Sequence, residues 1–553
     1  MKIQHALIVV GILAVLNAAA YLLPVRWDMT DDRHYSLSEA SKTLLRNTDA
    51  PVGVTILLEG ELNSGFRRLK KAAEETLAEM AVYADIKDLN DLKDPTTLKD
   101  SLGLRPIVIH EREQNGKTAQ TMVYPYAVMT YKGRKAVVTL LKNTRGLSGE
   151  ENLNASIEQL EFAFMEALHL LTQRETPRIA ILEGHGEPDE AHTYDLMTAL
   201  SKYFQVDRGC IQNSDGRIQN SDVSIQTHML DGYKAVLVIS PQRAFSDVER
   251  FIIDQYLMRG GTVLWAMDGV QFSEQVLQSD GFTPVVAREL GLTEMLFRYG
   301  IRINPALVQD IQCLPIPVNV SNDPSQPNLQ PMPWTYAPLL LTSEGSPVTK
   351  SLGQIMSTFV SPIDAVGGED GIEKRILLAT STASRVTAAP AEVDLSDLNP
   401  DMNTFRYQYI PVAVSLEGVF PSVYAHRIAP EGIETHEPII KQSRRTRQIV
   451  IASGSILLNE VQKGQPLPMG YDRYSQMQFS NRDFAVNAVL WLTDEEGLIG
   501  LREKSVALRL LNDRRAHENR MQVQLVSTIS PIAILALIGG IVWIVRKRKY
   551  EIN

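Results

Sequence analysis

Residues 178–187 read RIAILEGHGE and contain the clearest indication of the fold class of the chain. Its first half, Arg178 to Leu182, is a short apolar run of the kind that forms a strand buried on both faces. Amphipathic helices and further apolar runs alternate after it, at 191–204, 235–240, 247–259 and 262–267. This alternation predicts an α/β fold in which helices cover both faces of a mostly parallel sheet.

The sequence after this series contains more strand-like runs, at 375–379, 410–416 and 448–452. They either complete the same sheet or form a second α/β lobe. Two stretches, 315–347 and 383–403, are predicted as long loops, the first because it is rich in Pro, Ser and Asn. We therefore expect one or more doubly wound α/β domains with loop insertions over residues 151–495.

The region before it predicts a smaller α/β domain over residues 24–150. A strand is expected at 51–60, an amphipathic helix at 65–83, a strand at 107–110 and a hairpin at 122–141 that turns at Lys132-Gly133-Arg134. This order suggests a thioredoxin-like domain. No CxxC motif is present to give it redox chemistry.

Both ends of the chain are apolar. Residues 6–23 form an 18-residue run interrupted by Asn17, and 526–545 form a 20-residue run without charge, so each predicts a transmembrane helix. A cleaved signal peptide is the alternative for the first run, because Ala18-Ala19-Ala20 fits a cleavage site. The basic tetrad Arg546-Lys547-Arg548-Lys549 predicts a cytoplasmic tail over 546–553, and two spans then place residues 1–5 in the cytoplasm too. Residues 496–525 are expected to form a juxtamembrane helix.

Composition and charge exclude several classes of protein. The chain has 553 residues, of which 22% are charged and 44% hydrophobic, which excludes a disordered or fibrous protein. Its formal net charge of −10 argues against a broad nucleic-acid-binding surface. Two cysteines, Cys210 and Cys313, permit at most one disulfide, and whether they pair is left open.

Motifs that carry known chemistry are missing from the sequence. It contains no P-loop, no GxSxG, no HExxH and no GxGxxG. We therefore predict that the chain is not an enzyme and that it holds no cofactor or resident metal.

The segment Glu183-Gly184-His185-Gly186-Glu187 is the most site-like part of the chain. It follows a predicted parallel strand, and ligands of α/β sheets bind at that end of the strands. His185 between two carboxylates suits proton transfer or metal binding, with His192 as a second nitrogen ligand. The alternative, which we favour, is a turn or recognition loop whose polar residues cap the next helix. Glu183, His185 and Glu187 are thus candidate recognition residues without a catalytic role.

An ordered set of motifs along the chain resembles one family, the GldG-type auxiliary, substrate-binding-like subunit of gliding-motility-associated ABC transporters. The motifs are Trp27-Asp28-Met29-Thr30, Arg33 to Ser38, Leu58-Glu59-Gly60 before Gly65 to Leu69, the EGHGE turn, Ser346 to Lys350, Pro411 to Val414 with Glu417-Gly418, and Arg509-Leu510-Leu511 before the final apolar run. Glu59 and Arg67 stand in these motifs and join the candidate recognition residues.

The resemblance implies a bacterial inner-membrane protein of the Bacteroidota type, with a large periplasmic region similar to glutamine-amidotransferase-like folds that lack the nucleophile. It also implies two partners, an ABC permease and a cytoplasmic ATPase, and no nucleic acid. This chain departs from the family at Ser453 and Ser455, where an acidic residue is frequent, and at Asp85 to Asp88, where a strand is eroded.

Three functions follow from these observations. The first is a non-catalytic transporter subunit that binds substrate or transmits motion to its partners. The second is an envelope scaffold that binds no small ligand. The third is a periplasmic hydrolase that uses Glu183, His185 and Asp189. The missing reaction motifs favour the first.

Overall fold

The computed structural model describes residues 37–550 except 61, 87–103, 113–117, 143–147, 174, 212–226, 320–327, 368–370, 396, 399, 432, 434–436, 495–496, 498 and 504–519. The chain divides into two compact units, residues 1–505 and 506–553. The first unit contains every β-strand that the described residues form.

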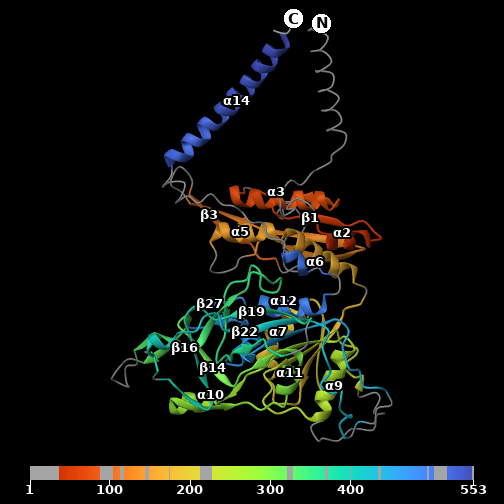
Figure 1. The fold of residues 1–553 in the computed structure, drawn as a ribbon, viewed down its shortest axis with the longest axis vertical. Helices are drawn as coiled ribbons and strands as arrows, with labels where there is room; N and C mark the ends of the chain where they lie inside the picture. The colour runs from red at the N-terminus through yellow and green to blue at the C-terminus, as the bar shows by residue number, and fades with distance from the viewer. Residues whose placement is uncertain are drawn as a thin grey trace. The chain divides into compact units, whose positions relative to one another are not determined.

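A mixed four-stranded sheet with the order β2-β1-β5-β6 forms within residues 53–139 (Figure 1). β1 (Gly53–Ile56) runs parallel to β2 (Tyr83–Ile86) and antiparallel to β5 (Tyr126–Tyr131). β5 continues into β6 (Arg134–Thr139) through a tight turn at Lys132 and Gly133, which both have positive φ. The predicted hairpin is therefore confirmed.

Helices and one separate hairpin accompany this sheet: α2 (Glu39–Arg46), α3 (Ser64–Glu79), α5 (Gly149–Glu158), α6 (Leu160–Thr172), β3 (Ile107–Arg112) and β4 (Thr118–Val123). The predicted helix at 65–83 is α3, which begins at the N-cap Asn63, whose side chain accepts from the backbone N–H of Phe66. Its buried stripe of Leu69, Ala73 and Leu77 shares a core with β1 and α6.

A larger sheet of ten strands dominates the rest of the first unit, in the order β15-β16-β19-β22-β23-β10-β9-β7-β8 with β17 paired to β16. Its strands are β7 (Arg178–Glu183), β8 (Gln205–Cys210), β9 (Ala235–Ile239), β10 (Thr262–Ala266), β15 (Cys313–Asn319), β16 (Leu329–Thr342), β17 (Ile355–Met356), β19 (Glu373–Ala379), β22 (Pro411–Gly418) and β23 (Thr446–Ile451). The five strands from β8 to β23 in this order are parallel, and β22 onward is antiparallel. The structure is mixed α/β, and the later strand-like runs belong to the same sheet. The prediction of a mostly parallel sheet is wrong, because the strands from β22 onward pair antiparallel.

The order of the parallel strands creates a topological switch point. β7 has β8 on one side and β9 on the other, so the chain leaves β7 in one direction and later builds the sheet in the opposite direction. The connections at the carboxyl ends of β7 and β9 therefore diverge, which is where α/β sheets leave room for ligands.

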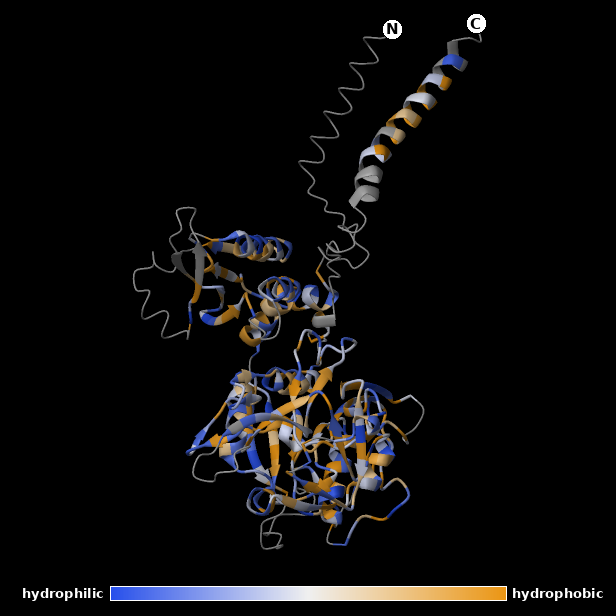
Figure 2. Ribbon diagram, turned by 90° about the vertical axis from the view of Figure 1, so that its left-hand side faces the viewer, coloured by the Kyte–Doolittle hydropathy of each residue, from blue (hydrophilic) through white to orange (hydrophobic). Residues whose placement is uncertain are grey.

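Helices cover both faces of the large sheet (Figure 1). Side chains alternate along each strand, so that Leu237 packs with α7 (Glu190–Leu200) and α12 (Asn481–Thr493), whereas its neighbours Val236 and Val238 pack with α9 (Asp247–Met258) and α11 (Thr293–Tyr299). Figure 2 shows the apolar residues concentrated along these central strands. Both cores are almost completely shielded from solvent, as expected for strands that read as continuous apolar runs.

The two predicted loop stretches are wrong in large part. Residues 315–347 contain most of β15 and the whole of β16, which form a long antiparallel hairpin, and 383–403 contain β20 (Ser384–Ala388) and β21 (Ala391–Asp394). Pro315 and Pro317 pair with Pro333 and Pro331 across the hairpin. The prolines lie where the hairpin extends away from the sheet centre, and there a missing backbone donor is tolerated.

Short elements complete the unit: β11 (Val270–Gln271), α10 (Glu274–Asp280), β12 (Phe282–Ala287), β13 (Arg302–Ile303), β14 (Ala306–Asp310), β18 (Ile363–Asp364), η2 (Met402–Thr404), η3 (Gly454–Leu457), β24 (Val461–Gln462), β25 (Gln465–Pro466), β26 (Tyr471–Asp472), β27 (Met477–Gln478) and η4 (Ile499–Glu503). β12 pairs with β11 and β21, and β14 pairs with β20.

The second unit contains α14 (Arg520–Tyr550), which includes the predicted span at 526–545. Among the residues that the structure describes, no helix combines the length and the apolar character needed to cross a membrane. This finding contradicts the predicted transmembrane helix at 526–545. The prediction rested on the absence of charge, although the run begins with the polar residues Ser527, Thr528 and Ser530 and contains Pro531.

The same finding contradicts the predicted localisation, which depended on two membrane spans. An inner-membrane protein with both termini in the cytoplasm and a large periplasmic region requires those spans, and α14 does not supply one. The other predicted span, at 6–23, lies outside the described residues, as do most of the juxtamembrane residues expected at 496–525.

Candidate functional site

The predicted EGHGE segment lies at the switch point of the large sheet, directly after β7. Gly184 and Gly186 have φ of 113° and 78°, in the left-handed region that favours glycine. A Cβ at Gly186 would lie 3.1 Å from Cβ of Gln242, which follows β9. The two glycines thus let the loops after β7 and β9 approach each other closely.

His185 is the centre of this closed turn. Its side chain is buried, with Nδ1 3.2 Å from Glu187 Oε1 and Nε2 3.1 Å from Glu249 Oε1. Its ring stacks on Phe245 with 3.8 Å between the ring centroids. Because each ring nitrogen faces a carboxylate oxygen, the arrangement fits a protonated imidazole that donates on both sides.

The electrostatics support this charge state. Burial on its own lowers the pKa of His185, but the hydrogen bonds and charges of Glu187 and Glu249 outweigh it and raise the pKa to about 9. Burial likewise opposes ionisation of Glu249, whose pKa is nevertheless lowered by His185 and by hydrogen bonds from Ser246. His185 is therefore a fixed cation near neutral pH, with neither nitrogen open to accept a proton or bind a metal.

Backbone hydrogen bonds close the switch point further. The carbonyl oxygen of His185 accepts from the backbone N–H groups of Gln242 at 2.7 Å and Arg243 at 2.8 Å. The Gly184 carbonyl accepts from Arg243 Nη2 at 3.1 Å. The loops after β7 and β9 are consequently joined, and Gly184, Gly186, Gln242 and Arg243 form the exposed rim of the closed turn.

The other acidic residues near the turn have separate partners. Glu183 Oε1 accepts from Arg208 Nε at 2.6 Å, and Arg208 also donates to the Pro188 carbonyl. Asp189 is the N-cap of α7 and accepts from the backbone N–H of His192 at 3.1 Å, with His192 Nδ1 2.6 Å from the same oxygen. The helix cap is therefore Asp189, two residues after the EGHGE segment, whereas Glu183 and Glu187 bond to Arg208 and His185 and do not cap α7 as predicted.

A second polar cluster at the same edge was not predicted. Ser240 follows β9 with φ of 47°, and its Oγ donates to Asp268 Oδ2 at 2.7 Å. The backbone N–H of Gly454, after β23, donates to Asp268 Oδ1 at 2.9 Å. A Cβ at Gly454 would lie 2.4 Å from Ser240 Cβ, so only glycine fits there. A positive φ at a non-glycine residue costs about 1–2 kcal/mol and marks a position that its surroundings hold firmly.

Arg288 extends this cluster towards a small cavity. It donates to the Val270 carbonyl at 3.2 Å and to the side-chain oxygen of Gln242. Burial lowers the pKa of Arg288, and the nearby charge of Asp268 partly opposes that shift. Asp268 and Arg288 line a cavity of about 220 Å³ beside β10. The sequence signals for this cluster are a Ser-Pro and an Asp-Gly that each follow a strand.

Ser240 of this cluster stands where a nucleophilic serine can stand, but its hydroxyl is bonded to a carboxylate and not to a histidine. Ser240 stands on a sharp turn after a parallel strand, yet its hydroxyl donates to a carboxylate, and Gln242 Nε2 donates to the Ser240 carbonyl at 2.9 Å. Within the described part of the chain, no imidazole makes a hydrogen bond to Ser240. Asp268 thus joins the turn after β9 to the turn after β23.

Glu59 and Arg67 do not join these residues. Glu59 follows β1 of the four-stranded sheet and forms an ion pair with Lys70 of α3, whose hydrogen bond lowers the pKa of Glu59. Arg67 is exposed on α3. Glu59 follows β1 and Arg67 lies on α3, and within the described residues neither shares a site with Glu183, His185 and Glu187.

The two cysteines are free. Cys210 ends β8 and Cys313 begins β15, and these strands stand at opposite ends of the ten-stranded order. The two cysteines therefore do not form a disulfide. A disulfide requires the Cα atoms of its two cysteines to lie within about 7 Å of each other.

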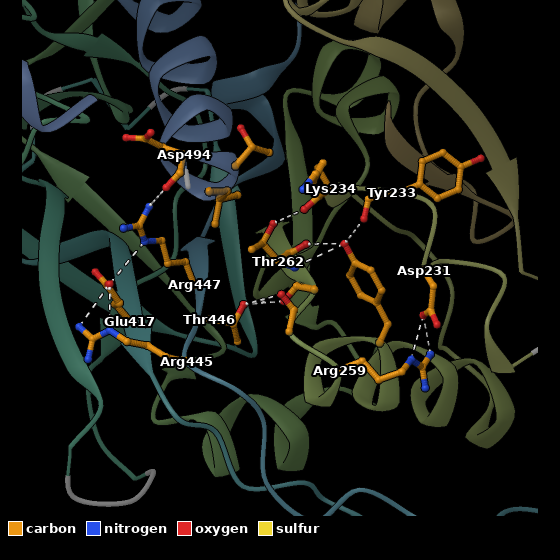
Figure 3. Close-up of a pocket in the computed structure, with 15 residues that line it drawn as sticks. Asp231, Tyr233, Lys234, Arg259, Thr262, Glu417, Arg445, Thr446, Arg447 and Asp494 are labelled. Carbon is orange, nitrogen blue, oxygen red and sulfur yellow. Dashed lines mark hydrogen bonds and ion pairs between the residues drawn. The ribbon is translucent and has the colours of Figure 1, made fainter. Parts of the chain in front are cut away.

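A cavity lies at the opposite edge of the sheet, where β9, β10 and β23 begin (Figure 3). It has a volume of about 670 Å³ and contains four basic and three acidic side chains, namely Lys234, Arg259, Arg445, Arg447, Asp231, Glu417 and Asp494. The sequence does not show that these residues meet, because they come from distant segments of the chain.

Comparisons with known proteins place the fold in a family. The family model described as "ABC-type uncharacterized transport system", an ABC transporter auxiliary family, matches residues 176–488. A domain of unknown function matches residues 31–130. Comparison with curated proteins finds no match.

One solved structure, titled "mmIFT52 N-terminal domain", is 14% identical to this chain. The alignment covers 57% of this chain and 97% of that one, with a TM-score of 0.31, which is too low to support a conclusion. The family match instead extends over more than half of the chain and includes the whole sheet from β7 to β23. The protein therefore belongs to the ABC transporter auxiliary family.

Proposed function

We propose that this protein is a non-catalytic subunit of an ABC transport system that works with a separate permease and an ATPase. The family match supports a transporter-associated role. The ordered motifs from Trp27 to Leu511 support the narrower assignment to the gliding-motility-associated, GldG-type branch.

One observation carries the proposal: the chain closes its own switch point. In ligand-binding α/β proteins this crevice is open to a nucleotide or substrate. Here the backbone of Gln242 and Arg243 is bonded to His185, and the His185 side chain is held between two carboxylates. The groups that would do chemistry are used to fix the two loops in place, and the exposed rim is available for recognition by a protein partner.

The arrangement does not favour the hydrolase alternative. A hydrolase built on Glu183, His185 and Asp189 requires the three side chains to converge on a substrate. Glu183 instead binds Arg208, His185 binds Glu187 and Glu249, and Asp189 caps α7. Each group is therefore engaged by a partner of its own.

The experiment is affinity purification of the full chain from the cells in which it is naturally expressed. We expect a permease and an ATPase to be recovered with it. Arg243→Glu changes the exposed rim of the switch point and should reduce that recovery several-fold. Arg406→Glu is the matched control, because Arg406 is also exposed and also donates to a backbone carbonyl, that of Asn403 at 2.8 Å.

Two results would contradict the proposal. Recovery of envelope proteins without either transport subunit would favour the scaffold. Equal recovery with the Arg243→Glu and Arg406→Glu variants would show that partners do not contact the closed turn.

A further inference from the structure

The edge of the large sheet opposite the EGHGE turn contains a cavity that the proposed function does not use. It forms where antiparallel β22 meets parallel β23, because the carboxyl end of one strand then lies beside the amino end of the other. Glu417 near the end of β22 is paired in register with Arg447 of β23. Gly260 and Gly261, at the carboxyl end of α9, and Thr493, at the end of α12, contribute to the wall.

Glu417 organises two guanidinium groups in this cavity. Its Oε1 lies 3.3 Å from Arg445 Nε, 3.2 Å from Arg445 Nη2 and 3.5 Å from Arg447 Nε. Arg447 Nη1 donates to the carbonyl oxygens of Trp491 at 2.8 Å and Asp494 at 2.9 Å. Figure 3 shows Glu417 between the two arginines, with Asp494 beside Arg447.

The acidic side chains of the cavity already have basic or backbone partners. Asp231 accepts from Arg259 Nε at 2.9 Å and lies 2.6 Å from His228 Nδ1. Asp494 accepts from the backbone N–H of Ile499 at 2.8 Å. Glu417 is shared by Arg445 and Arg447, as described above.

The guanidinium groups retain donors. A guanidinium carries five N–H donors, and the contacts within the described residues use Nε and Nη2 of Arg445 and Nε and Nη1 of Arg447. Arg445 Nη1 and Arg447 Nη2 make no hydrogen bond or ion pair within that part of the chain. The cavity therefore offers charged donors, whereas each of its carboxylates already accepts a hydrogen bond.

We propose that this cavity binds a small molecule bearing an oxyanion, a phosphate or a carboxylate. A planar guanidinium matches the two oxygens of such a group, and a pair of arginines fixed by one carboxylate is pre-organised to receive it. Lys234 also lines the cavity and adds positive charge to it. The hydroxyl groups of Thr262 and Thr493 already donate to the backbone carbonyl oxygens of Lys234 and Val489. A volume of about 670 Å³ falls within the range of small-molecule sites.

Calorimetric titration of the full chain with inorganic phosphate, pyrophosphate and citrate tests the proposal. We expect saturable binding of at least one probe, with a Kd that rises with NaCl concentration because the contact is ionic. Preference for phosphate and pyrophosphate identifies a phosphate ligand, and preference for citrate identifies a carboxylate ligand. The absence of saturable binding with all three probes would overturn the proposal.

Variants locate the binding. Arg445→Gln should raise the Kd about tenfold, because one charged donor pair is lost. Arg375→Gln is the matched control, since Arg375 also pairs with a glutamate, Glu373, at 2.6 Å and is similarly exposed, but lies outside the cavity. Lys234→Gln is the second variant and should also raise the Kd. An unchanged Kd in both cavity variants, or an equal rise in Arg375→Gln, would contradict the assignment.

Anion binding at this cavity goes beyond the proposed function, and the two can be tested independently. The Arg445→Gln chain should still recover the permease and the ATPase, because Arg445 lies at the opposite edge from the closed turn. Loss of anion binding with intact recovery supports both proposals.

Discussion

The two edges of the ten-stranded sheet are built from the same strands but have opposite character. At the carboxyl edge, His185, Ser240 and Asp268 bond to their own chain and fill the switch point. At the amino edge, Glu417 and its two arginines border a cavity of about 670 Å³. The switch point between β7 and β9, where α/β proteins usually bind ligands, is closed, and the antiparallel addition of β22 creates a recess at the other edge.

Fold topology alone therefore does not locate a binding site. A switch point predicts a crevice, but side chains and loops of the protein itself can fill that crevice. The contrast also predicts different energetics, because buried groups at the carboxyl edge should tolerate change poorly, whereas exposed groups at the amino edge should tolerate it well.

The largest effect is expected from His185→Ala. It leaves Glu187 and Glu249 facing each other without the cation between them, so we expect a loss of about 3–5 kcal/mol in the free energy of unfolding. Chemical denaturation measures it, with His192→Ala as the control on an exposed histidine that also pairs with an aspartate. A loss below about 1 kcal/mol would show that the carboxyl edge is not braced by His185.

The pH dependence of stability tests the same group without a mutation. The pKa of His185 is raised in the folded state from 6.5 to about 9, so its contribution is fully present below pH 6.5 and is lost as the pH rises through about 9. The shift corresponds to about 3 kcal/mol.

Denaturation curves from pH 6 to pH 10 measure this contribution, with His185→Ala as the reference. The difference in unfolding free energy between the parent and this variant should shrink over that range. A difference that stays constant would show that His185 is not held as a cation.

Gly454→Ala should have a smaller effect. Its Cβ would lie 2.4 Å from Ser240 Cβ, and the required shift in a packed edge costs about 1–3 kcal/mol. Gly209→Ala in β8 is the control, because a Cβ there meets no atom within 4 Å. Thermal unfolding compares the two, and equal melting temperatures would mean that the Ser240 turn is free to move.

The smallest effect on stability is expected at the amino edge. Glu417→Gln removes a carboxylate whose partner Arg445 is 64% exposed, and exposed ion pairs contribute at most about 1 kcal/mol. The same substitution should alter the affinity for the oxyanion probes, because Glu417 orients both arginines. If Glu417→Gln instead destabilises the fold as strongly as His185→Ala, the contrast between the edges fails.

The sequence predicted the strands that are apolar along their whole length. β7, β9 and β10 were expected within one or two residues of their bounds, because strands buried on both faces leave a continuous apolar signal. The hairpin β15–β16 was missed, because its prolines predict a loop when only local composition is considered. Its pairing depends on the partner strand, which local composition does not reveal.

The candidate site was predicted only where its residues are close in sequence. His185 and Glu187 are two positions apart, and their proximity follows from the turn. Glu249 was missed because it reaches His185 from the first turn of α9, after a different strand. The Ser240–Asp268–Gly454 cluster draws on three strands, and a single sequence does not reveal which strands are neighbours.

The two free thiols should differ in their reactivity towards labelling reagents. Cys210 is exposed at one end of the strand order, whereas burial raises the pKa of Cys313 at the other end to about 11. Because the thiolate is the reactive form, maleimide dyes should modify Cys210 first at neutral pH. A donor fluorophore and an acceptor fluorophore, attached one after the other to the two cysteines, would then report on the distance across the sheet in the unmutated protein.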